Sequence, residues 1–161
     1  MVESLKLWLA TYLDVPINRI DEIGKPDVAG FLIIWSIFEK QTFKIFFRKN
    51  NIIPFSEKHK SILAPLVYEY SNYFHLRFQN KKKFKNLIHD DSFLPFDIIL
   101  KKSFIELTDE EHITLVLYVL YRYRNNIFHG NKSVLSWLKY KEQINKCVEV
   151  MILILDNQLT L

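Results

Sequence analysis

The chain has 161 residues, of which 49% are hydrophobic, and a formal net charge of +4. This composition excludes a disordered chain, and the length favours one domain over 1–161 rather than two. The positive balance indicates a mild preference for polyanionic partners.

Residue counts exclude several kinds of site. The three glycines, Gly24, Gly30 and Gly130, are too widely spaced for a phosphate-binding loop of the Walker or dinucleotide type. Cys147 is the only cysteine, so neither an internal disulfide nor a thiolate zinc site can form, and we expect no metal, no cofactor and a cytoplasmic protein. No uncharged apolar run reaches the roughly 18 residues of a membrane span, so we expect no membrane partner.

Apolar residues recur at helical spacing along most of the chain, without a convincing period-two strand pattern. The segment 28–48 is strongly apolar, and we expect it at the centre of a bundle or against a partner. The predicted helices are 2–13, 28–48, 56–79 with a kink or fresh start at Pro65, 96–103, 108–128, and a last one from 134 or 137 to about 156. The sequence therefore predicts an all-α bundle of about five or six helices.

A capping box marks the start of the helix at 108. Thr108 can accept a hydrogen bond from the backbone of Glu111, whose carboxylate can reach back to Thr108. His112 follows in the same first turn, where solvent exposure is expected. Gly130 supplies a stop signal at the other end.

That other end carries a compact polar motif, Arg124-Asn125-Asn126-Ile127-Phe128-His129-Gly130. Arg124 and His129 are five residues apart, about 140° round an ideal helix, so they can meet only if the helix ends near Phe128. Asn125 stands four residues before His129 and can support the imidazole from the same side.

This motif resembles the active-site motif of the HEPN superfamily. HEPN proteins are small and α-helical, and many of them are metal-independent ribonucleases. The resemblance is specific over 124–130 and loose elsewhere. It implies that His129 acts as general base or acid, that Arg124 holds the phosphate, and that Asn125 and Asn126 orient them. The expected products of RNA cleavage are a 2′,3′-cyclic phosphate and a 5′-OH.

The resemblance also implies partners. Two motifs usually face each other across a HEPN dimer, so a homodimer is expected, in phage defence or a toxin–antitoxin system with an antitoxin protein as a further partner. The alternative within the family is a non-catalytic module that binds RNA, nucleotide or a partner protein. A coincidental surface turn in an unrelated helical protein is the third interpretation.

Two further features are candidates for supporting roles. Glu39 matches the polar residue that HEPN proteins often carry on an early helix, or it is a surface Glu that pairs with a lysine. A basic cluster with Phe84 inside it is either an RNA contact or a solvated turn; its members are Lys81, Lys82, Lys83 and Lys85. Arg122 is a further RNA-contact candidate; six residues separate it from His129, so it also satisfies the Arg-to-His spacing.

Overall fold

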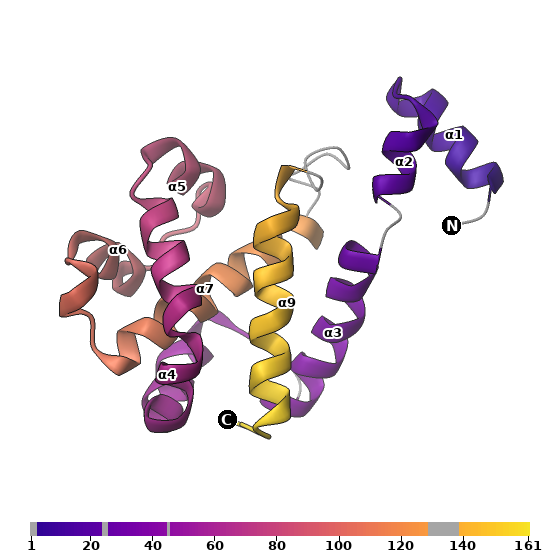
Figure 1. Ribbon diagram of the computed structural model, residues 1–161. Coiled ribbons are helices and arrows are strands. Elements are labelled where there is room, and N and C mark those ends of the chain that lie inside the picture. Colours follow the sequence, from indigo (N-terminus) through magenta and orange to yellow (C-terminus); the bar gives the residue numbers. More distant parts are fainter. Residues whose placement is uncertain (1–2, 24–25, 45, 129–138) are drawn as a thin grey trace.

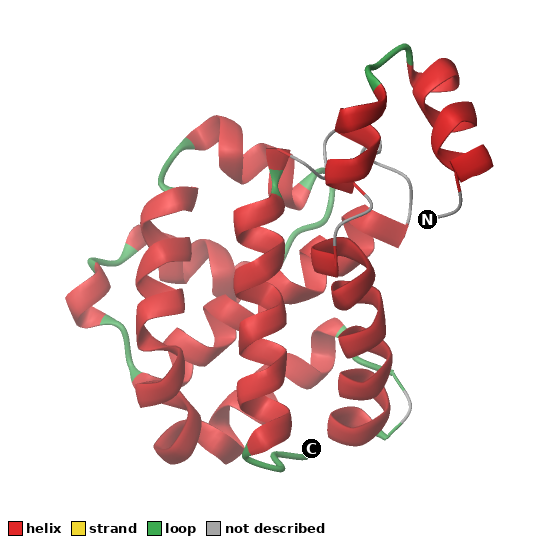
Figure 2. Cartoon of the chain, turned by 45° about the vertical axis from the view of Figure 1, so that its right-hand side comes forward, coloured by secondary structure: helices red, strands yellow, loops and turns green. Residues whose placement is uncertain are grey.

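The computed structural model describes residues 3–23, 26–44, 46–128 and 139–161. Within these ranges the chain is all-helical, with loops but no strand (Figure 2). The α-helices are α1 Glu3–Leu13, α2 Ile17–Ile23, α3 Pro26–Phe43, α4 Ile52–Phe78, α5 Lys81–Ile88, α6 Leu94–Lys101, α7 Asp109–Phe128 and α9 Lys141–Asp156. Two short 3-10 turns, Lys49–Asn51 and Phe104–Glu106, precede α4 and α7. None of the described helices is both long enough and apolar enough to cross a membrane.

The helix α7 lies at the centre of the bundle. Every residue from 112 to 120 is buried, so α7 is enclosed on all of its sides over that stretch. It packs along α4, while α3 packs along α9. The helices α5 and α6 lie beside α4 and α7, on the side away from α3 and α9 (Figure 1). The hairpin of α1 and α2 stands apart at the opposite end.

The apolar helix α3 does not occupy the centre that its sequence suggested. Phe31, Trp35 and Phe38 pack into the core, whereas Ile33 is 63% exposed and Ile37 is 40% exposed. The described structure therefore leaves Ile33 and Ile37 of α3 exposed; the expectation that this helix faces a partner stays a prediction.

Two helices were missing from the sequence prediction, so the described residues form eight α-helices and not five or six. The first is α2, and the second is α5, which was assigned only as a basic cluster. The N-terminus of α5 is fixed by Asn80, whose side chain accepts hydrogen bonds from the backbone of Lys82 at 3.1 Å and Lys83 at 3.0 Å. An Asn cap of this kind starts a helix that hydrophobic periodicity alone does not reveal.

The boundaries of two other helices differ from expectation. α3 ends at Phe43 and not at 48, because Lys44 adopts a left-handed conformation with φ of 66°. α4 continues through Pro65 without a fresh start. Pro65 lies on the exposed side of α4, and burial of Leu63 and Val67 on the other side holds the turns around it in place. The predicted start of the last helix lies outside the described residues.

The predicted capping box is confirmed. The Thr108 N–H donates to Glu111 Oε2 at 3.0 Å, and the Glu111 N–H donates to Thr108 Oγ1 at 3.3 Å. Lys102 Nζ donates to Glu111 Oε1 at 2.5 Å. Burial by itself raises the pKa of Glu111, but the bonds from Lys102 and Thr108 outweigh it and leave the pKa lowered.

A lowered pKa makes Glu111 a pH-dependent source of stability. The contribution is present above the unfolded-state pKa near 4.5 and is lost as the pH falls through the lower folded-state value. We therefore expect Glu111→Gln to reduce the free energy of unfolding at neutral pH by about 1 kcal/mol. Urea unfolding of both proteins across the acid range should show this difference shrinking below pH 4.5; a difference independent of pH would contradict the assignment.

The core of α3 can be tested with a matched pair of phenylalanines. Phe38 is 0% exposed and Phe46 is 55% exposed. Phe38→Ala should lower the free energy of unfolding by about 3–5 kcal/mol because it leaves a cavity among packed rings. Phe46→Ala should cost less than about 1 kcal/mol. Denaturant titration measures both values, and equal losses would argue against the described position of α3.

Candidate functional site

The candidate motif occupies the last turns of α7. The structure describes Arg124, Asn125 and Asn126 within this helix, whose described residues run to Phe128. His129 and Gly130 lie outside the described residues. The described part of the site therefore consists of Arg124 and the side chains that contact it.

Arg124 lies half-buried between α7 and α3. Its Nη1 donates to Asn125 Oδ1 at 3.0 Å, and its guanidinium carbon lies 5.6 Å from the centre of the Trp35 ring. Trp35 is only 3% exposed, so it forms a fixed surface under the cation. These two contacts orient a planar, permanently charged group at the helix end, where it can form paired hydrogen bonds to phosphate oxygens.

Glu39 is linked to Arg124 through Trp35, which contacts both residues. The indole N–H of Trp35 donates to Glu39 Oε2 at 3.3 Å, and the Phe47 N–H donates to Oε1 at 3.0 Å. Trp35 thus contacts both the predicted acidic residue and the predicted phosphate-binding arginine. Its place one helical turn before Glu39 was visible in the sequence, but nothing there indicated that its ring would carry Arg124.

Arg122 has a different set of contacts. It is 6% exposed, and it donates to the Leu87 carbonyl at 3.2 Å from Nε and to the Ile88 carbonyl at 2.9 Å from Nη2. Its Nη1 donates to Asp91 Oδ2 at 2.9 Å. Since the last carbonyls of a helix have no partner within it, Arg122 caps the C-terminus of α5 and complements its negative dipole end. The RNA contact predicted for Arg122 would require these bonds to be exchanged.

Asn126 supports this cap. Its side chain is fully buried, its Nδ2 donates to the Leu87 carbonyl at 3.0 Å, and its Oδ1 accepts from Arg122 Nη2 at 3.4 Å. Asn125, in contrast, accepts from Arg124. The two asparagines that were expected to share one role therefore orient two different arginines.

The two arginines face opposite sides of α7. They are two residues apart, about 200° round the helix. Arg122 points to α5, which carries the basic cluster, whereas Arg124 points to α3. The four lysines of the cluster, Lys81, Lys82, Lys83 and Lys85, are all exposed.

Two reactive side chains elsewhere are buried. Burial raises the pKa of the Cys147 thiol, which disfavours the thiolate form. His112, expected to be exposed, is 5% exposed, because α4 and the 3-10 turn before α7 cover the first turn of α7. It is hydrogen-bonded to Ser71 Oγ at 2.9 Å, and burial lowers its pKa despite nearby Asp109 and Glu111.

Asp91 is a structural residue that the sequence did not reveal, because it stands in a loop without periodicity. It pairs with buried Arg122 at 2.9 Å and with half-exposed Lys49 at 2.6 Å. Asp91→Asn leaves a buried guanidinium without its counter-charge, so we expect a loss of about 2–4 kcal/mol in the free energy of unfolding. Lys49→Ala removes the more exposed pair and should cost less than about 1 kcal/mol. Chemical denaturation distinguishes these values, and a neutral Asp91→Asn would contradict the anchoring role.

Comparison with known proteins assigns no family and no function to this chain. The chain matches no family model, no curated protein and no solved structure. What the site does must therefore be argued from the chemistry of its residues.

Proposed function

We propose that this chain is a HEPN-type, metal-independent endoribonuclease that acts as a homodimer. The observation that carries the proposal is the position of Arg124 in the last turns of α7, with its guanidinium against Trp35 and hydrogen-bonded to Asn125. Five residues later the sequence has His129, directly after the last residue of α7. A fixed cation, and an imidazole five residues later in the sequence, are the groups that RNA cleavage by the substrate's own hydroxyl needs.

The chemistry follows from these two groups. His129 removes the proton from the ribose 2′-OH, and the 2′-oxygen attacks the adjacent phosphorus. The bond to the 5′-oxygen breaks, and an imidazolium protonates that leaving oxygen. Arg124 binds the non-bridging oxygens, whose negative charge grows in the pentacoordinate state. The products are a 2′,3′-cyclic phosphate and a 5′-OH, and the need for the 2′-OH predicts cleavage of RNA and not DNA.

A homodimer would complete the site by adding a second imidazole and guanidinium. The exposed apolar side of α3 supports this, because the helix whose Trp35 contacts Arg124 also presents Ile33 and Ile37 to solvent. A pair of motifs facing one another would let one imidazole act as base and the other as acid. The role in phage defence or with an antitoxin extends the family resemblance, whereas the cytoplasmic location rests on the single cysteine, Cys147.

Cleavage of total RNA in the presence of EDTA tests the proposal. Wild-type protein should leave fragments that end in a 2′,3′-cyclic phosphate. His129→Ala should reduce the rate by about 10²–10⁴-fold, as expected for loss of general acid–base catalysis, and Arg124→Ala should reduce it by a similar factor. Arg48→Ala, at an exposed arginine outside the site, is the matched control and should retain full activity.

The outcome separates the interpretations. Equal RNA decay in all variants would attribute the activity to a contaminant and overturn the proposal. Tight RNA binding by wild-type protein without any cleavage would favour the non-catalytic module.

A further inference from the structure

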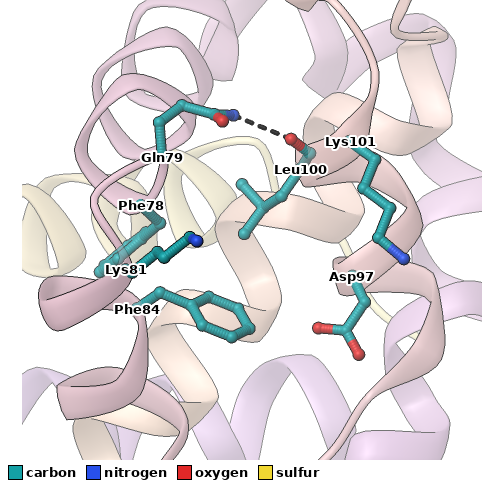
Figure 3. A pocket seen from close by; sticks show the side chains of 7 residues that line it. All are labelled: Phe78, Gln79, Lys81, Phe84, Asp97, Leu100 and Lys101. Carbon is teal, nitrogen blue, oxygen red and sulfur yellow. Dashed lines mark hydrogen bonds between the residues drawn. The ribbon is translucent and has the colours of Figure 1, made fainter.

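A pocket of about 370 Å³ opens between the end of α4, α5 and α6, on the side of α7 away from Arg124. Figure 3 shows the side chains that line it. They are Phe78, Gln79, Lys81, Phe84, Asp97, Leu100 and Lys101. A volume of this size accommodates a small organic ligand of one or two rings.

One wall of the pocket is an aromatic platform. The Phe84 ring lines the pocket, and Phe96 lies parallel to it on the core side, with centroids 6.1 Å apart and planes 9° apart. Phe78, which is 4% exposed, and Leu100 complete the apolar lining (Figure 3). A ring fixed in this way can stack against a flat ligand at little cost in side-chain entropy.

The pocket is already held open in the described structure. Gln79 Nε2 donates to the Leu100 carbonyl at 2.9 Å, which joins the end of α4 to the last turn of α6 (Figure 3). Asn80 then caps α5 beside this bond. The two sides of the pocket are therefore fixed relative to one another by backbone and amide contacts, and not by the ligand.

The charges around the pocket favour a polyanion. Lys81 and Lys101 belong to its lining, on α5 and α6 respectively, and Asp97 is the acidic residue among the lining side chains. Three more exposed lysines lie on α5, which carries no acidic residue. They are Lys82, Lys83 and Lys85. Lys85 is about 40° from Lys81 round the helix, whereas Lys83 is about 200° from it and lines a separate hollow. The positive surface thus extends beyond the pocket, as a ligand with more than one phosphate requires.

We propose that this pocket binds one unpaired nucleotide of a single-stranded nucleic acid. The base stacks on Phe84, Lys81 and Lys101 contact its flanking phosphates, and the strand continues over the lysines of α5. The Asp97 carboxylate can accept from the N–H groups of the base edge. This site goes beyond the proposed cleavage chemistry, because it needs neither Arg124 nor His129.

Binding can be measured without cleavage by using a fluorescently labelled strand of 2′-O-methyl RNA, which lacks the attacking hydroxyl. Fluorescence anisotropy gives the dissociation constant for wild-type protein and for each variant. Lys81→Glu combined with Lys101→Glu should weaken binding by at least tenfold. It should also reduce the slope of log K against log salt by roughly 1.4, the value for two phosphate contacts at about 0.7 each.

The control has the same change in net charge at a distant position. Lys58→Glu combined with Lys60→Glu alters two exposed lysines in the first half of α4, and Lys60 lies roughly 27 Å from the Phe78 end of that helix at 1.5 Å per residue. We expect less than a threefold change in the dissociation constant. An equal loss in both double variants would mean general charge attraction and would overturn the pocket.

The stacking contact has its own test. Phe84→Leu keeps an apolar side chain against Phe96 but removes the ring, and should weaken binding about tenfold. Should this variant unfold, the lysine variants still decide the question, since both lysines are exposed. A single-stranded DNA and a duplex RNA test whether the bound nucleotide must be unpaired. The single strands should bind, and the duplex should bind at least tenfold more weakly.

Other ligands would give a different pattern. Equal affinity for a mononucleotide and for the strand would overturn the proposal that the ligand is a polynucleotide. If polyglutamate displaced the labelled strand as effectively as an unlabelled strand does, the proposal of nucleotide binding would be overturned. The lysine and Phe84 variants are compared on a 2′-O-methyl strand that cannot be cleaved, so their binding does not depend on catalysis. Failure of the pocket is thereby distinguishable from failure of the cleavage proposal, which the RNA decay assay addresses.

Discussion

The burial of α7 on all sides is the constraint on which the rest of the structure depends. Nine consecutive residues, 112 to 120, are withdrawn from solvent, so neighbours must cover every face of this helix. α4 covers it along its length, and α5, α6 and α9 pack against it as well. From Arg122 to Ile127 only Arg124 and Asn125 emerge to half-buried positions, and the other four residues stay buried.

That emergence separates two arginines that look equivalent in the sequence. Arg122 turns inward and caps the last carbonyls of α5, with Asp91 as its counter-charge and Asn126 as a further acceptor. Arg124 turns to α3 and rests on Trp35. The first arginine makes the helix end rigid, because it joins α7 to α5. The second can then present its guanidinium from a rigid base, which is what stabilising charge in a transition state requires.

The same cap also positions the basic helix. α5 is short and carries four exposed lysines, so by itself it would be a marginal helix. Asn80 at its start and Arg122 at its end satisfy the groups that a helix of this length leaves unpaired. Lys81 is thereby held beside Phe84, across the pocket from the wall that α6 forms.

The sequence by itself determined the all-α class and the capping box at Thr108, because periodicity and caps are local signals. The choice of Arg124, Asn125 and Glu39 as candidates also came from the sequence. Only the tertiary structure decided which side each faces: that Trp35 lies beneath Arg124, that Asp91 and Arg122 form a buried pair, and that α5 and α6 enclose a pocket. The first two contacts join residues 89 and 31 positions apart, and the pocket joins residues up to 23 positions apart; no local pattern encodes such pairings.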